Sequence, residues 1–190
     1  MPSPSTASAP ADPESQRRAL LAAASRLVRQ KPAEPLTPTR LCQEAGVSEA
    51  AFATNWPEAL AFERQLLVSL LDEVRDSVAK TTLGMAPGLA RLKLAVEAYL
   101  DANRARPAVR ALALKLQADA DGAATLRSRV AGFTLMMEME LQAMQWPHPA
   151  ATARLFTAAV LETAYAEHEA GAKVPALRDC VFRYFDNGRA

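Results

Sequence analysis

The stretch from Thr37 to Trp56, TPTRLCQEAGVSEAAFATNW, most constrains the fold of this 190-residue chain. It predicts two short helices joined by an A-G-V-S turn at residues 45–48. Gly46 can adopt the left-handed conformation that ends a helix, and Ser48 can cap the next helix through its hydroxyl. This is the sequence form of a helix-turn-helix, whose second helix reads DNA.

Helices are also predicted on both sides of this motif. Apolar spacing predicts a helix from Asp12-Pro13 to Lys31-Pro32 and a leucine-rich helix from Pro57 onward. After a break at residues 81–87, further helices are predicted over 89–106, 107–117, 123–145, 150–170 and 175–186, with a turn at 119–122. No segment alternates as a strand would.

The prediction is therefore an all-α fold of about nine helices, with an N-terminal three-helix head and a C-terminal helical domain. We expect a disordered tail over residues 1–13, a helix-turn-helix domain over 14–60, and a ligand-binding and dimerisation domain over 61–190.

Composition sets the outer limits on function. A net charge of +1 and 50% hydrophobic residues indicate a soluble globular chain. No membrane span or secretion signal is evident, and a cytoplasmic location is the default. Cys42 and Cys180 imply no disulfide framework and are expected as small core residues; a redox sensor built on either is the less favoured alternative.

Catalytic and metal-binding patterns are missing from the sequence. There is no G-x-S-x-G, P-loop or dinucleotide glycine motif. His148 lies between two prolines, and His168 is expected on a solvated helix face between Glu167 and Glu169, so neither is placed to share a metal ion. We expect a protein that is not an enzyme and needs no cofactor or metal.

The order of elements resembles the tetracycline-repressor (TetR) family over about Arg17 to Leu71. The resemblance is carried by the basic pair Arg17-Arg18, the threonine-led helix from Thr37, the A-G-V-S turn, and Phe52, Trp56 and Pro57. It implies a repressor that binds double-stranded operator DNA as a homodimer and responds to a small, apolar effector. It further implies that the last two helices form a four-helix bundle with those of the second copy.

The candidate DNA-binding residues come from the motif and from this resemblance. Arg17 and Arg18 would touch the DNA backbone, and the hydroxyls of Thr37 and Thr39 can reach phosphate. The full predicted set is Arg17, Arg18, Thr37, Thr39, Arg40, Ser48, Glu49, Ala50, Ala51, Ala53, Thr54 and Asn55.

Three of these residues could read bases. Asn55 can pair with adenine, Thr54 can touch a thymine methyl, and Glu49 can accept from a cytosine amine. The structural alternatives are helix capping for Asn55 and Thr54, and a favourable interaction with the helix dipole for Glu49. Phe52 and Trp56 are expected in the core.

The recognition helix departs from the family pattern in its charge. Glu49 replaces the usual lysine, Ala50 and Ala51 replace small polar residues, and the usual Tyr-Tyr-His becomes A-T-N at 53–55. Between residues 33 and 63, Arg40 is the only basic residue, against Glu34, Glu44, Glu49, Glu58 and Glu63. Phosphate neutralisation dominates DNA affinity, so we expect weak binding unless the first helix compensates. The alternative is a TetR-like helical protein whose head acts through a protein partner, or which only binds a ligand.

The effector prediction rests on the C-terminal helices. Methionines suit a flexible apolar ligand, although a methionine stripe is also typical of a core, and Glu140 or Asn103 could orient a polar end of the ligand. The predicted set is Tyr99, Asn103, Leu116, Phe133, Met136, Met137, Glu140 and Met144.

The dimer prediction uses the apolar faces of the last two helices. The alternative is that these faces pack only within their own chain. The predicted set is Leu155, Phe156, Ala159, Val160, Thr163, Leu177, Val181, Phe182 and Phe185.

Overall fold

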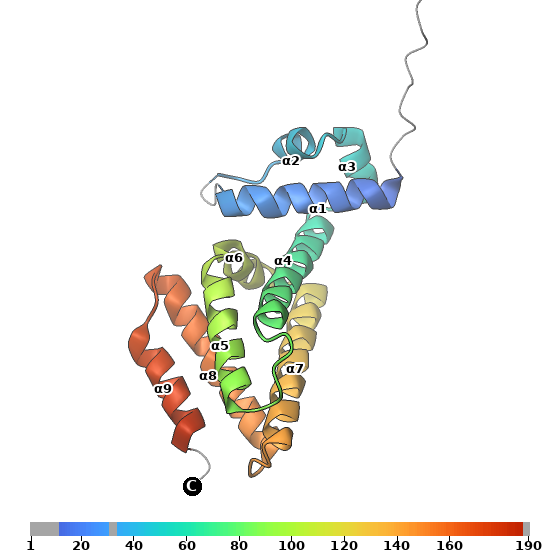
Figure 1. The fold of residues 1–190 in the computed structure, drawn as a ribbon. Coiled ribbons are helices and arrows are strands. Elements are labelled where there is room, and N and C mark those ends of the chain that lie inside the picture. Colours follow the sequence, from blue (N-terminus) through green and yellow to red (C-terminus); the bar gives the residue numbers. More distant parts are fainter. Residues whose placement is uncertain (1–11, 31–33, 188–190) are drawn as a thin grey trace, which may run out of the picture. The chain divides into compact units, whose positions relative to one another are not determined.

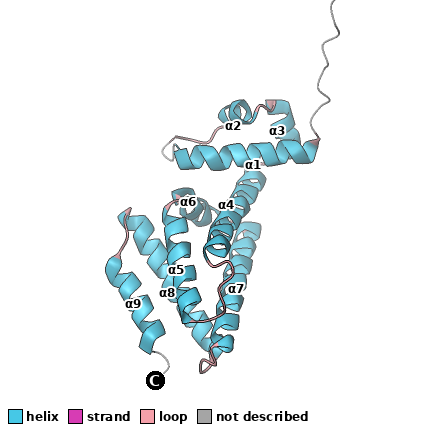
Figure 2. Ribbon diagram, in the orientation of Figure 1, coloured by secondary structure: helices cyan, strands magenta, loops and turns pink. Residues whose placement is uncertain are grey.

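The computed structural model describes residues 12–30 and 34–187. Within these ranges the secondary structure consists of nine helices and no strand (Figures 1 and 2). The predicted all-α class is therefore confirmed. The tail predicted over residues 1–13 lies outside the described residues except for its last two positions. The helices are α1 (Pro13–Gln30), α2 (Pro38–Ala45), α3 (Glu49–Asn55), α4 (Ala59–Thr81), α5 (Leu89–Arg104), α6 (Pro107–Leu116), α7 (Ala120–Ala143), α8 (Pro149–Ala170) and α9 (Pro175–Asn187).

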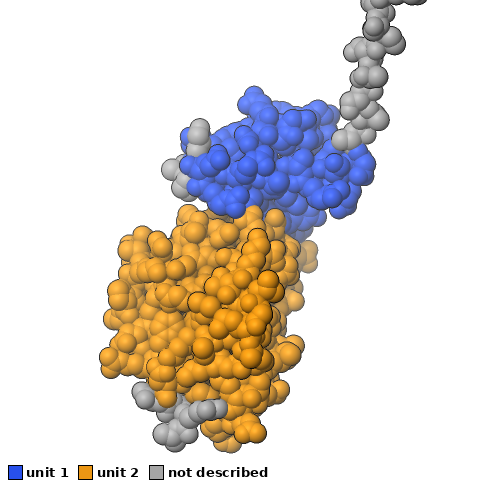
Figure 3. All heavy atoms as spheres, in the orientation of Figure 1, with its two compact units in different colours: residues 1–66 blue, residues 67–190 orange. Residues whose placement is uncertain are grey.

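The chain divides into two compact units, residues 1–66 and residues 67–190 (Figure 3). The first unit holds α1, α2, α3 and the beginning of α4, and the second holds the remaining helices. Among the described residues, no helix is long and apolar enough to cross a membrane.

The turn between α2 and α3 has the predicted local chemistry. Gly46 has a φ of 67°, which is left-handed, and the Val47 N–H donates to the Cys42 carbonyl at 3.0 Å. The hydroxyl of Ser48 accepts a hydrogen bond from the Ala51 N–H at 3.2 Å. A glycine is favoured at position 46 because other residues adopt this backbone conformation at a cost. Thus the helix-turn-helix prediction is confirmed in its geometry.

An aromatic cluster lies in the core of the first unit. Phe52, Trp56 and Phe62 are buried, with ring centroids 5.1 to 5.5 Å apart. The indole N–H of Trp56 donates to the Gln65 side chain at 3.1 Å. Cys42 is buried as predicted, and this burial raises the pKa of its thiol, with Glu49 adding to the effect. The buried face of α3 is therefore fixed against α4, while its opposite face is left exposed.

The second unit is built around the antiparallel pair of α7 and α8, which pack along their length. The Thr134 hydroxyl on α7 donates to the Thr157 hydroxyl on α8 at 3.1 Å, which fixes the register of the pair. Helices α5 and α9 cover the inner face of α8. The buried core comprises Leu92, Val96, Leu100, Met137, Leu141, Trp146, Ala153, Phe156, Val160, Val181 and Phe185.

The turn expected at residues 119–122 is instead the start of α7. The Asp119 carboxylate accepts a hydrogen bond from the Gly122 N–H at 2.8 Å and so caps this helix. Gly122 passes so close to α6 that an added Cβ would lie 2.6 Å from the Leu116 carbonyl oxygen. The glycine that suggested a turn is needed here for close helix packing.

Candidate nucleic-acid interface and effector region

The outer face of α3 is the surface that a recognition helix would present. Glu49, Ala50, Ala53 and Thr54 are exposed on it, whereas Ala51 is half-buried. The Thr54 hydroxyl donates to the Ala50 carbonyl at 2.9 Å, which leaves the oxygen lone pairs for an external donor. This face therefore offers methyl groups, one hydroxyl and one carboxylate, and it carries no positive charge.

Asn55 is buried, and its side chain is fully engaged within the first unit. Its amide N–H groups donate to the Ala51 carbonyl at 2.9 Å and to the Gln16 side chain at 3.4 Å. Arg17 donates to the Asn55 side-chain oxygen and to its backbone carbonyl, each at 3.1 Å. These contacts join the beginning of α1 to the end of α3, so they support the structural alternative for Asn55 over base reading.

Arg17 is held by a second contact as well. Its guanidinium lies 5.6 Å from the ring centroid of Trp56, within the range of a cation–π interaction. To contact DNA, Arg17 must give up these internal partners in exchange for phosphate oxygens. This loss reduces its net contribution to the free energy of DNA binding.

Most other basic side chains near the motif are paired with glutamates. Arg26 is 3.1 Å from Glu44, and Arg40 is 2.9 Å from Glu34. Arg18, by contrast, is exposed and has no partner among the described residues. Arg18 is therefore the predicted phosphate contact whose charge is fully available.

The three predicted hydroxyl contacts lie at the beginnings of α2 and α3. Thr37 accepts a hydrogen bond from the Arg40 N–H at 3.4 Å, and Ser48 caps α3 as described above. Thr39 is exposed in the first turn of α2. Each of these two caps satisfies one backbone N–H of the first turn, and the beginning of a helix is a place where phosphate is favoured. Their contact with DNA remains a prediction.

In the second unit, the structure brings together part of the predicted effector set. Tyr99 of α5 stacks on Phe133 of α7, with ring centroids 5.0 Å apart, and both pack against the core cluster that contains Met137. Burial raises the pKa of Tyr99 to about 12, and the nearby Tyr165 adds to this effect. The phenol of Tyr99 therefore stays neutral over the physiological range.

The other predicted effector residues have separate roles. Met144 also packs against this cluster, Leu116 is fully buried beside Gly122, and Met136 is exposed. Glu140 forms an ion pair with Arg91 at 3.2 Å and accepts from the Gly88 N–H at 3.3 Å.

Asn103 is hydrogen-bonded to Tyr99, one turn before it on α5. Its amide donates to the Tyr99 carbonyl at 2.9 Å. Of the two residues expected to orient a ligand, Asn103 lies next to the aromatic pair and Glu140 is already committed.

Sequence reasoning missed Arg110, a half-buried arginine of α6. Its guanidinium lies 3.7 Å from the ring centroid of Tyr165 on α8. Its Nε is buried and lacks a hydrogen-bond partner within the described part of the chain. A cation of this kind is a candidate for binding an anionic group. The available signal was its position among apolar residues in the sequence PAVRALALKL, where Lys115 is the one other charged residue.

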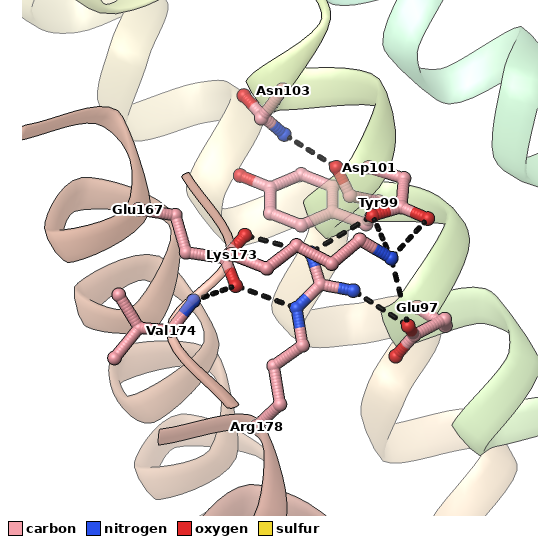
Figure 4. A network of polar contacts seen from close by, with 8 residues as sticks. All are labelled: Glu97, Tyr99, Asp101, Asn103, Glu167, Lys173, Val174 and Arg178. Atoms are coloured by element: carbon pink, nitrogen blue, oxygen red, sulfur yellow. Dashed lines mark hydrogen bonds and ion pairs between the residues drawn. The ribbon is translucent and has the colours of Figure 1, made fainter. Parts of the chain in front are cut away.

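Sequence reasoning also missed a buried ion network centred on Arg178 of α9 (Figure 4). Its guanidinium contacts Glu167 of α8 at 2.6 and 2.7 Å, Glu97 of α5 at 2.6 Å and Asp101 of α5 at 2.9 Å. Glu167 is 1% exposed, which contrasts with the solvated helix face expected around His168. The network fastens α9 to both α5 and α8.

The hydrogen bonds of this network shift the ionisation of its carboxylates. Those from Arg178 lower the pKa of Glu167 against the effect of burial, and the Val174 N–H adds to the lowering. Desolvation opposes ionisation of Asp101, but hydrogen bonds from Lys173 and Arg178 outweigh it and lower the pKa. Both carboxylates are therefore charged near neutral pH. Among the described residues, no group of side chains has the composition of a metal site.

The predicted dimer residues divide into two groups. Phe156, Val160, Thr163, Val181 and Phe185 are buried within one chain, and Leu177 and Phe182 are partly buried. Leu155 and Ala159 are exposed on α8. Cys180 is also exposed, so its expected place in the core is wrong. Enclosed side chains are unavailable to a second copy in this conformation.

The fold is that of TetR-family transcriptional regulators. A transcriptional regulator from Rhodococcus sp. Rha1 matches with a TM-score of 0.70 at 18% identity, over 93% of this chain and 95% of that one. A TetR-family regulator from Agrobacterium tumefaciens matches with a TM-score of 0.67 at 16% identity, over 94% and 100%. NemR from E. coli, in its reduced form, matches at 0.67 and 15% identity, over 92% and 97%. No protein-family model and no curated protein sequence matches the chain.

Proposed function

We propose that this protein is a transcriptional regulator, acting as a repressor, that binds operator DNA as a homodimer and releases it when a small effector binds the second unit. The observation that carries the proposal is the complete helix-turn-helix, with α2 and α3 both capped and the outer face of α3 exposed. The shared fold of the compared regulators supports the same function. A catalytic function has no comparable support.

The chemistry of the head favours contact with bases through methyl groups. Ala50 and Ala53 can pack against thymine methyls, and the Thr54 hydroxyl can accept from a base amine. Arg18 supplies phosphate contact from α1. Affinity would then depend on shape and apolar contact more than on charge.

The effector proposal rests on the region around Tyr99 and Phe133. Its aromatic pair suits an apolar body, and Arg110 suits an acidic group. We expect a ligand in this region to bind the DNA-free conformation more tightly than the DNA-bound conformation. This difference in affinity supplies the free energy that shifts the protein toward the DNA-free conformation.

A second candidate function is recognition of a partner protein by the head. It is favoured by one observation, namely that the polar side chain of Asn55 is engaged internally while the exposed face of α3 is acidic and alanine-rich. Such a face binds DNA poorly, because it offers no positive charge to neutralise phosphates.

The deciding experiment is a fluorescence-anisotropy titration of the purified protein against DNA from upstream of its own coding sequence and from intergenic regions across the genome. We expect sequence-dependent binding to at least one fragment over a scrambled control, weakening as salt rises. Ala53→Glu, which adds a carboxylate to the exposed face of α3, should abolish the preference. A protein that binds every fragment no better than scrambled DNA would contradict the regulator proposal and support the partner-protein function.

A further inference from the structure

The exposed side chains of α3 share one side of that helix. The exposed positions are Glu49, Ala50, Ala53 and Thr54. Because successive residues of an α-helix are rotated by about 100°, these four positions fall within an arc of about 140°. Phe52 and Asn55 are buried and point to the opposite side. We call the four exposed side chains the outer face of α3.

The outer face of α3 offers hydrogen-bond acceptors and methyl groups, and its side chains have no proton left to donate. The Thr54 hydroxyl gives its proton to the Ala50 carbonyl at 2.9 Å and keeps its lone pairs and its methyl group. The ionised Glu49 carboxylate accepts only, and it has no hydrogen-bond or ion-pair partner in the described part of the chain. Ala53 adds a second alanine methyl group.

The polar donors nearest to this face are engaged elsewhere. The Asn55 amide donates to the Ala51 carbonyl at 2.9 Å, inside the first unit. The guanidinium of Arg40 is paired with Glu34 at 2.9 Å. The Ser48 hydroxyl lies at the beginning of α3, where it caps the helix, and its one proton can form only a single bond. The helix therefore lacks the paired donors that recognise guanine.

The base edges in the major groove respond differently to such a face. Guanine presents the acceptors N7 and O6, whereas cytosine presents its N4 amine and thymine its C5 methyl group. A carboxylate is repelled by the acceptors of guanine and attracted by the amine of cytosine. Alanine and threonine methyl groups pack against the thymine methyl. The outer face of α3 thus fits pyrimidine edges and rejects guanine.

We propose that α3 reads DNA without donating a side-chain hydrogen bond. Glu49 selects cytosine through its N4 amine and excludes guanine at the same position. The methyl groups of Ala50, Ala53 and Thr54 select thymine. This inference rests on the proposed regulator function and specifies the base chemistry that the operator must present. The contacted bases of each half-site are therefore pyrimidines.

The test begins with selection of duplexes from a random library by the purified full-length chain. The enriched duplex is then resynthesised with base analogues and titrated by fluorescence anisotropy. Deoxyuridine lacks the C5 methyl group; one buried methyl is worth about fourfold in affinity, so replacing every thymine should weaken binding by at least about tenfold. Replacing guanine by 7-deazaguanine removes N7 and should change affinity by less than about twofold. A scrambled duplex with the same analogues controls for general effects on DNA.

A donor placed on the outer face should reverse the preference at one position. Selection with Glu49→Arg should recover guanine where the wild type recovers cytosine. Binding of that new duplex should weaken by at least about fivefold with 7-deazaguanine, because a bidentate contact is lost. Glu169→Arg, the same charge change at an exposed position of α8, should select the wild-type sequence. Circular dichroism checks that both variants keep the helical fold.

The outcomes separate this inference from the function on which it rests. An enriched duplex that tolerates uracil within about twofold, or loses more than about fivefold with 7-deazaguanine, overturns the donor-free reading and leaves the regulator function standing. Recovery of the wild-type sequence by Glu49→Arg also overturns it. Absence of any enriched sequence overturns the regulator function and this inference together.

Discussion

At the scale of single residues, polar side chains of the helix-turn-helix unit form hydrogen bonds that stabilise the fold, and these bonds occupy groups that were expected to contact DNA. Arg17 and Asn55 lie 38 positions apart and join α1 to α3 through two hydrogen bonds. Base reading by Asn55 would require it to give up buried partners, which costs free energy. The sequence could indicate that Asn55 lies near the end of a helix, but it could not indicate that Arg17 would be its partner.

We expect Asn55→Ala to reduce the free energy of unfolding by about 1 to 3 kcal/mol, because it removes buried hydrogen bonds to a charged group. Equilibrium urea unfolding followed by circular dichroism measures this change. Thr54→Ala, which removes only an exposed hydroxyl, should stay within about 0.5 kcal/mol of the wild type. Unchanged stability together with weaker operator binding would show that Asn55 reads a base.

At the scale of helices, local signals predicted where most elements begin and end. Gly46, Ser48 and the prolines act on the backbone beside them, so their effects can be read from neighbouring residues. The predicted start of α7 was wrong because the glycine at position 122 is required for close packing against Leu116 of the preceding helix, and not for a turn. The burial of Glu167 was not predicted for a related reason. Its counterion, Arg178, lies on another helix, and a helical pattern of polar residues by itself predicts that a charged residue is exposed to solvent.

The Arg178 network makes a prediction about how α9 is held. Arg178→Met should destabilise the chain by about 3 to 5 kcal/mol at pH 7, because it leaves the Glu167 carboxylate buried without its cation. Replacing both residues, as Arg178→Met with Glu167→Leu, should recover much of this loss. Lys173→Met, at the exposed edge of the network, should cost less than about 1 kcal/mol. Urea unfolding at fixed pH measures all three.

The pH dependence of these variants has a defined sign. In the wild type the pKa of Glu167 is lowered by folding, so its stabilisation is present above the unfolded-state pKa and is lost as pH falls toward the folded value. In Arg178→Met the unpaired, buried Glu167 should have a raised pKa and take up a proton on mild acidification. The difference in stability between the two proteins should therefore shrink from pH 7 to pH 5. A constant difference would exclude Glu167 ionisation as the cause.

At the scale of the whole molecule, the fold was predicted far better than its surfaces. Helix order follows from periodicity and capping, which each helix carries in its own sequence. Packing between distant segments determines which apolar side chains of a helix are buried. From the sequence alone, Phe156 and Leu155 therefore appear equally suited to a dimer interface. Only the structure separates the enclosed side chain from the exposed one.

The balance of charge in the first unit leads to a prediction for DNA binding. Arg26 and Arg40 are neutralised by glutamates, so few phosphates should be neutralised per copy and the salt dependence should be shallow. Glu49→Lys should raise affinity at low salt and steepen the slope of log K against log salt by about one per copy. Glu169→Lys, the same charge change at an exposed position of α8, is the control in the anisotropy titration. Equal effects of the two substitutions would place α3 away from DNA.

The connection between α8 and α9 takes part in the ion network as well as joining two helices. Lys173 contacts Asp101, and the Val174 N–H donates to Glu167, so backbone and side chain of this short segment both serve the same buried cluster. An inserted or deleted residue there would move all these partners at once. Among related chains, the length of this segment should therefore change only where the arginine and its carboxylates have also been replaced. The loop and the network should be inherited, or lost, together.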